Sequence, residues 1–117
     1  MTEIPALTYE ATPIQEVQNP VLSAEGVKLF VKREDLNNHY VQGNKWWKLK
    51  YNIEEALRQG HETMLTFGGA YSNHILATAA AASAVGFRSV GIIRGEECLP
   101  LNPILSSAKR YGMEIHY

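Results

Sequence analysis

The chain has 117 residues, of which 45% are hydrophobic and 20% are charged, a balance that predicts one globular domain and excludes an intrinsically disordered chain. Eleven Lys and Arg against twelve Asp and Glu give a formal net charge of -1, which excludes a global field drawing the protein toward nucleic acid or acidic lipid. The one cysteine, Cys98, can form no internal disulfide, so a reducing compartment, the cytoplasm, is expected.

The N-terminal sequence carries no targeting signal that we can identify. Met1 to Pro5 has neither the basic flank nor the apolar core of a signal peptide, and no window approaches the ~18 apolar residues of a membrane span. We therefore expect a soluble protein that has neither a membrane nor a nucleic acid as its partner.

The first predicted elements are two short strands. Prolines and weak periodicity predict an arm over residues 1–26 with one strand at 14–17. Apolar residues alternate at 27–32, which predicts a second strand with these side chains on one side. A loop rich in turn residues then runs to Gly43.

From Lys45 the apolar spacing becomes that of a helix. The predicted apolar face consists of Trp46, Leu49, Ile53, Ala56 and Leu57. Asn44 is a suitable N-cap, and Gly60 is a suitable C-terminal stop.

Strands and helices alternate in the rest of the chain. We predict a buried strand at 63–67, an alanine-rich helix at 73–85, a strand at 89–93, a helix from Asn102-Pro103 to Gly112, and a strand at 113–117. This order is typical of right-handed crossovers over a parallel sheet, so the predicted fold is α/β, a three-layer open parallel sheet with crossover helices. No helix follows the last strand to cover the sheet, so we expect a fragment that is incomplete at its C-terminus or is completed by a partner.

Lys45 is the first candidate site residue. It follows Gly43 and Asn44 where a loop becomes a helix, at the edge of the predicted apolar face. The backbone dipole is positive at that end and favours the neutral amine, which condensation with an aldehyde requires. The alternative is an ordinary solvated lysine, since lysines are almost never fully buried.

The segment from Gly68 to His74 is the second candidate. It follows a predicted strand and opens a helix, the position where open parallel sheets bind ligands and where free amides suit a carboxylate or phosphate. Ser72 could serve as a hydroxyl in this crevice, with Asn73 and His74 beside it. The alternative is an ordinary turn in which Ser72 only caps the helix.

Other chemistries have weaker support. No phosphate-loop or dinucleotide glycine pattern occurs, and the four histidines lack ligand spacing, so neither a nucleotide nor a metal is expected. Trp46 and Trp47 among lysines could stack on single-stranded nucleic acid, but helical phasing favours a core position for Trp46.

Three segments together resemble the N-terminal part of a known family. They are Lys32-Arg33-Glu34-Asp35, then Gly43-Asn44-Lys45 with Lys48 and Leu49, then Gly68-Gly69 with Ser72-Asn73-His74. Their order and spacing resemble pyridoxal-phosphate enzymes of the D-cysteine desulfhydrase and 1-aminocyclopropane-1-carboxylate deaminase family, which have the fold type II of tryptophan synthase beta. The likeness covers nearly the whole chain.

The resemblance implies a role for each matching residue. Lys45 would hold pyridoxal 5'-phosphate covalently and later transfer a proton, and Asn73 would bond the cofactor's ring hydroxyl. Ser72 would bind the substrate carboxylate or take part in the chemistry, with Asn73 and His74 also contacting the substrate. The reaction implied is elimination or ring opening of a small amino acid, with release of ammonia and a 2-oxo acid.

The resemblance also implies an organisation of the chain. Residues 1–50 would be the arm and strands of a larger domain with the cofactor lysine, and residues 51–117 the truncated βα repeats of a smaller domain. Relatives of this family are usually dimers, which implies a homodimer for the full-length protein. The glycine-rich loop that holds the cofactor phosphate has no counterpart here, so we expect the fragment alone to be inactive.

Two positions differ from the family pattern. Trp47 stands where the family often has arginine and Tyr71 where it often has glutamine, so the preferred amino acid stays open. The main alternative function is a non-catalytic α/β module that binds a small anion at the Ser72 crevice.

Overall fold

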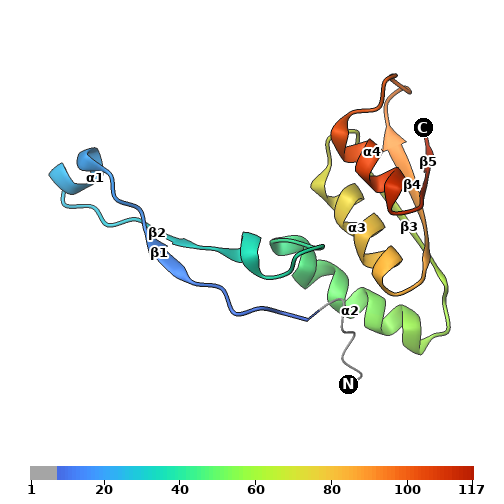
Figure 1. Cartoon of the computed structure of the whole chain (residues 1–117), viewed down its shortest axis with the longest axis horizontal. Helices are drawn as coiled ribbons and strands as arrows, with labels where there is room; N and C mark the ends of the chain where they lie inside the picture. Colours follow the sequence, from blue (N-terminus) through green and yellow to red (C-terminus); the bar gives the residue numbers. More distant parts are fainter. Residues whose placement is uncertain (1–7) are drawn as a thin grey trace.

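A parallel sheet of three strands, in the order β3-β4-β5, carries the segment that follows Gly68 (Figure 1). The computed structural model describes residues 8–117, and the first seven residues of the predicted arm lie outside them. The strands are β3 (Thr63–Gly69), β4 (Arg88–Arg94) and β5 (Met113–His116). Their bounds agree with the prediction to within two residues, and each pair is parallel along its whole register.

Helices α3 (Asn73–Ala84) and α4 (Pro103–Arg110) form the crossovers between these strands. Asn102 caps α4 as predicted, because its Oδ1 accepts a hydrogen bond of 3.0 Å from the Leu105 amide. Both helices pack against the same face of the sheet (Figure 1). The α/β class with a parallel sheet and crossover helices is confirmed, although a helical layer on the second face is not among residues 8–117.

The second face of the sheet is exposed along β3. Leu65 and Phe67 are 59% and 68% exposed, whereas Thr66 between them is buried against α3. The prediction of a wholly buried strand at 63–67 is therefore wrong within the described chain. The physical reason is the alternation of side chains along a strand, which places Leu65 and Phe67 on the face that no helix covers.

Helix α2 (Asn44–Arg58) packs across α3 through a core of apolar side chains. The cluster contains Val41, Trp46, Leu49 and Ile53 against Ala77, Ala80 and Ala81. Three of the five residues predicted for the apolar face are thus buried, but Leu57 is 43% exposed. It lies in the last turn of α2.

Both ends of α2 are set by glycines. The helix begins at Asn44 with Gly43 as its N-cap, so the prediction of an Asn44 cap is wrong by one residue. Gly43 has φ +67°, in the left-handed region that favours glycine. The predicted stop at Gly60 is confirmed by its φ of +75° just after the C-cap.

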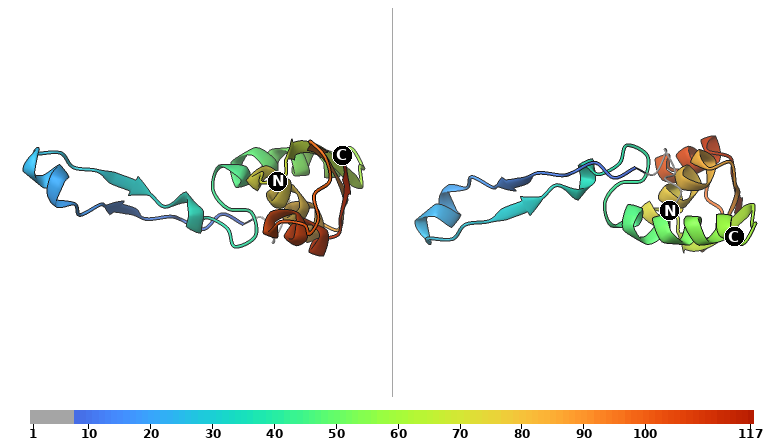
Figure 2. Two further views of the ribbon diagram at one scale, coloured as in Figure 1. Left: turned by 90° about the horizontal axis from the view of Figure 1, so that it is seen from above. Right: turned by 90° about the horizontal axis from the view of Figure 1, so that it is seen from below.

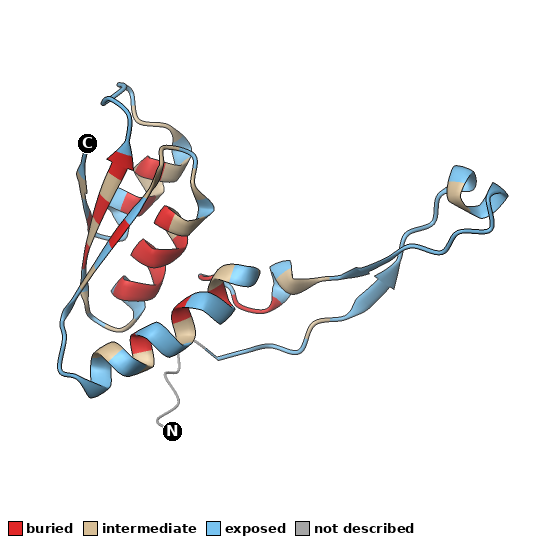
Figure 3. Ribbon diagram, turned by 180° about the vertical axis from the view of Figure 1, so that it is seen from behind, coloured by how far each residue is buried: buried red, intermediate tan, exposed pale blue. Residues whose placement is uncertain are grey.

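The arm is a narrow antiparallel hairpin that projects from the rest of the chain (Figure 2). Its strands are β1 (Ile14–Glu16) and β2 (Phe30–Lys32), joined through α1 (Pro20–Ala24), a helix the sequence did not predict. The predicted strand at 27–32 is shorter than expected and exposed, because no other helix or strand among residues 8–117 covers the hairpin (Figure 3). A 3₁₀ turn, η2 (Glu34–Leu36), links β2 to the loop before α2.

No helix in the described part is both long and apolar enough to cross a membrane. The predicted division at residue 50 falls inside the continuous helix α2, and the two-domain organisation stays a prediction.

The end of β3 provides a test of the packing, because α3 leaves almost no space above Gly68. A Cβ at Gly68 would lie 2.7 Å from Ile75 Cγ1 and 3.2 Å from Ser72 Cβ, and Ile75 is fully buried. We expect Gly68→Ala to lower the free energy of unfolding by about 1–3 kcal/mol, measured by urea denaturation. Gly69→Ala is the matched control, because its Cβ would meet only Arg94 Nη2 at 3.6 Å. Equal stability losses for the two variants would contradict this packing.

Candidate functional site

A pocket of about 630 Å³ lies where the start of α2 meets α3 and the end of α4. This volume lies within the range of small-molecule and cofactor sites. Its lining includes Gly43 and Lys45 from the start of α2, Asn73 and Ala77 from α3, and Ser107 and Arg110 from α4. Two residues predicted from separate segments, Lys45 and Asn73, therefore share one pocket.

Lys45 is the half-buried cation of this pocket. Lys45 is the second residue of α2. The loop before it contains the buried Val41, and the residue after it, Trp46, is 1% exposed in the core. No hydrogen bond or ion pair engages the Lys45 amine within residues 8–117. The predicted partial shielding of the lysine is confirmed, and its amine is available to a ligand in the pocket.

Asn73 is the first residue of α3 and is exposed at the same pocket. Its position at the start of a helix leaves backbone amides of that turn without helical partners. An amide side chain can both donate and accept hydrogen bonds. Lys45 and Asn73 together thus offer an amine and a neutral polar group to one ligand.

Ser72 does not line the pocket. Its Oγ accepts a hydrogen bond of 3.2 Å from the His74 amide, and its own N–H donates to the Gly69 carbonyl at 3.0 Å. This is the helix-cap geometry that the sequence left open as an alternative. A role for Ser72 toward a substrate stays a prediction.

His74 is turned toward buried hydroxyl groups. Its Nε2 lies 2.9 Å from Thr66 Oγ1 and 3.5 Å from Thr78 Oγ1. Burial lowers the pKa of His74 below its ordinary value of 6.5, and the charges of Lys45 and Lys48 lower it further. The ring is therefore within electrostatic range of Lys45, and its predicted contact with a substrate stays a prediction.

The sequence did not identify the α4 side of the pocket. Ser107 and Arg110 line it, and Arg110 Nη2 donates to Ser107 Oγ at 3.0 Å. Their helix was predicted, but which of its faces lines the pocket depends on how segments far apart in the chain pack together. Lys45 and Arg110 bring two positive charges to a lining whose carboxylate is Asp35, so the pocket suits a ligand with anionic groups.

Comparison with known proteins identifies the relatives of this chain. No family model matches it. A protein of Pyrococcus abyssi, named provisionally as a 1-aminocyclopropane-1-carboxylate deaminase, is 43% identical over 104 residues, 88% of this chain and 30% of that protein. The D-cysteine desulfhydrase of Salmonella typhimurium is 33% identical over 112 residues, 95% of this chain and 32% of the enzyme.

Solved structures agree with the sequence matches. The crystal structure of a 1-aminocyclopropane-1-carboxylate deaminase homologue superposes with a TM-score of 0.77 at 33% identity, covering 97% of this chain and 37% of that one. The chain is homologous to proteins that carry the names 1-aminocyclopropane-1-carboxylate deaminase and D-cysteine desulfhydrase. The resemblance predicted from the sequence motifs is confirmed. The chain spans about a third of the length of the relatives it matches.

The titration of His74 tests how close Lys45 and Lys48 lie to its ring. We expect Lys45→Met or Lys48→Met to raise the pKa of His74 toward its ordinary value, because each removes a positive charge acting on the ring. The measurement is the pH dependence of the ring-proton NMR shift. Lys28→Met in the arm is the control and should leave the titration unchanged, and an equal response to all three variants would contradict the placement of Lys45.

The same lowered pKa predicts a pH dependence of stability. The folded chain binds the His74 proton less readily than the unfolded chain, so the unfolded state gains protons first as the pH falls. The free energy of unfolding should therefore fall as the pH drops through 6.5 toward the lower folded value. His74→Gln should reduce this dependence in urea denaturation at a series of pH values.

Proposed function

We propose that this chain is the lysine-bearing part of a pyridoxal-phosphate-dependent lyase or deaminase. The substrate is a small amino acid of the D-cysteine or 1-aminocyclopropane-1-carboxylate type, and the products include ammonia and a 2-oxo acid. The observation that carries the proposal is the shared pocket of Lys45 and Asn73, in a chain whose relatives include enzymes with these two names.

The groups in the pocket fit an aldehyde cofactor with a phosphate. Lys45 supplies an amine without a protein partner in the described chain, Asn73 supplies a hydrogen-bonding amide, and Arg110 adds positive charge. The volume of about 630 Å³ accommodates a cofactor and a small substrate together. When bound, the cofactor would supply an electron sink for the substrate carbanion.

The roles of the chain's own residues follow from their positions. Lys45 would hold the cofactor aldehyde through its amine and, once displaced by the substrate amino group, would move a proton at the substrate α-carbon. Asn73 would hold the ring hydroxyl in register. Ser72, by capping α3, would keep Asn73 at the mouth of the pocket and present the free amides of that turn to a carboxylate.

A second candidate function is a module that only binds a small anion. It is favoured by the presence of two cationic side chains, Lys45 and Arg110, in the lining of the pocket. The nucleic-acid alternative named Trp46 and Trp47, but Trp46 offers no stacking surface because its indole is 1% exposed, whereas Trp47 is 45% exposed and donates to Glu34. The homodimer implied by the family resemblance remains a proposal for the full-length protein.

Covalent labelling tests the proposal. Pyridoxal phosphate is added to the 117-residue chain and to the full polypeptide that the gene encodes, borohydride makes the lysine linkage permanent, and the labelled peptide is mapped by mass spectrometry. We expect the label on Lys45, and Asn73→Ala should lower its yield about fivefold, as loss of one hydrogen bond of ~1 kcal/mol would.

The control is Lys48→Met, which removes an exposed lysine one turn along α2 and should leave the Lys45 label in place. A label spread over the surface lysines, or none in either polypeptide, would overturn the proposal. A colourless protein that still binds small carboxylates at the pocket would instead favour the anion-binding module.

A further inference from the structure

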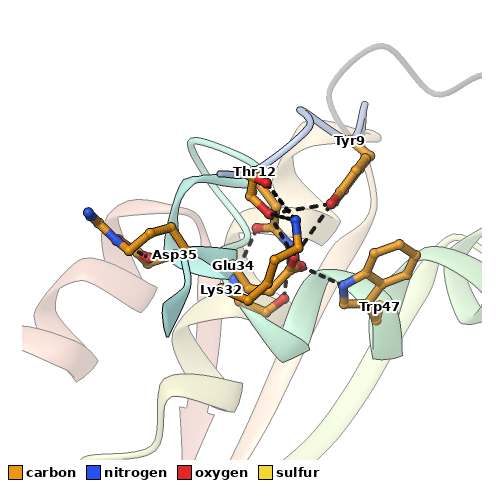
Figure 4. Close-up of polar contacts among 9 residues, drawn as sticks. Tyr9, Thr12, Lys32, Glu34, Asp35 and Trp47 are labelled. Carbon is orange, nitrogen blue, oxygen red and sulfur yellow. Dashed lines mark hydrogen bonds and ion pairs between the residues drawn. The ribbon is translucent and has the colours of Figure 1, made fainter. Parts of the chain in front are cut away.

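The carboxylate of Glu34 joins three segments of the chain beside the pocket (Figure 4). Its Oε1 accepts hydrogen bonds from Thr12 Oγ1 at 2.8 Å and from Tyr9 OH at 3.4 Å, and Lys32 Nζ lies 3.5 Å away. Its Oε2 accepts from Trp47 Nε1 at 2.9 Å. The donors come from the segment before β1, from β2 and from the first turns of α2.

The backbone of the same residue holds the loop that leads into α2. The Glu34 carbonyl accepts from the Gly43 amide at 3.0 Å. Asn37, which is fully buried, accepts from the same amide at 3.0 Å and donates to the Gly43 carbonyl at 3.1 Å. Asn37 also donates to Glu34 Oε2 at 3.3 Å, so both polar groups of Gly43 are fixed by one small cluster.

These contacts bracket Lys45 along the helix. Gly43 is the N-cap of α2, Trp47 lies four residues later, and Lys45 lies midway between them. No side chain in the described chain caps this helix N-terminus, so the hydrogen bonds of the Glu34 cluster hold it in place. Glu34 thereby contacts α2 on both sides of Lys45, which lines the pocket.

The carboxylate is held in its ionised form. The hydrogen bonds from Trp47 and Thr12 lower the pKa of Glu34, burial opposes them, and Lys32 lowers it further. A charged acceptor makes stronger hydrogen bonds than a neutral one. The cluster is therefore fully formed at neutral pH.

We propose that Glu34 is a positioning residue that, with Asn37, fixes the first turn of α2 and so directs the Lys45 amine into the pocket toward Asn73. This inference rests on the proposed function for its chemical consequence, because it concerns the lysine that would hold the cofactor. Glu34 itself does not line the pocket and acts on the site through its contacts with Gly43 and Trp47.

The test compares two lysines within one molecule. The full polypeptide that the gene encodes is treated briefly with pyridoxal phosphate and borohydride, and the ratio of label on Lys45 to label on Lys48 is measured by peptide mapping. Glu34→Ala should lower this ratio about tenfold, because a displaced amine reacts as an ordinary surface amine. Trp47→Phe, which removes the N–H donor and reduces a ring that packs against Tyr9 and Trp46, should lower it less, and the double variant should add little to Glu34→Ala.

Two further variants separate positioning from general stability. Glu34→Gln keeps one oxygen acceptor for Trp47 and should keep the ratio within about twofold of the unchanged protein. Glu55→Gln alters a carboxylate at the far end of α2, where it pairs with Arg58, and should leave the ratio unchanged. An unchanged ratio in folded Glu34→Ala, or an equal fall in Glu55→Gln, would overturn the inference.

Hydrogen–deuterium exchange gives a readout that needs no cofactor. Glu34→Ala should speed exchange of the amides from Gly43 to Trp47 and leave β3 and β4 unchanged, and unchanged exchange at Gly43 would overturn the inference. If the unchanged protein takes no label on Lys45, the proposed function fails, and this exchange alone decides the role of Glu34. If Glu34→Ala does not fold, Trp47→Phe, which deletes the hydrogen bond to Glu34 Oε2, decides both readouts.

Discussion

The close approach of α2 to α3 is the contact on which the pocket depends. Helix α3 is buried on nearly every side and carries alanines where it meets its neighbours, so that Trp46 can pack directly against Ala77, Ala80 and Ala81. A larger side chain at these positions would push α2 away from α3. Since Lys45 precedes Trp46 and Asn73 lies one turn before Ala77, this packing brings the amine and the amide to one cavity.

A second close approach fixes the start of α3. Gly68, the last residue but one of β3, lies beneath Ile75 and Ser72, so the turn into α3 is tight, and Ser72 caps the helix. The glycine serves helix–strand packing, whereas the sequence pattern suggested contact of its backbone with a ligand. The start of α3 is thus held by packing and by its cap, which suits the role proposed for Asn73.

Much of the fold follows from local signals. Period and end signals located all three strands of the sheet and its two crossover helices, because glycine, asparagine and proline act within a few residues of their own position. The exposure of apolar side chains is harder to predict from the sequence. Leu65, Phe67 and Leu57 have apolar side chains in regular elements, but whether they are covered depends on which neighbours reach them. The short helix α1 and the Glu34 cluster lacked a periodic signal of their own.

The sequence alone determined the family resemblance, the α/β order of elements and the choice of Lys45 and Asn73 as candidate site residues. Each of these rests on residue types at fixed spacing. Only the tertiary structure decided that these two residues share a pocket, that Arg110 joins them from α4, and that Ser72 is occupied as a cap. The physical reason is that spacing along a chain fixes the face of one helix or strand. The distance between faces of different elements is set by side-chain volume at their contact, which no single segment contains.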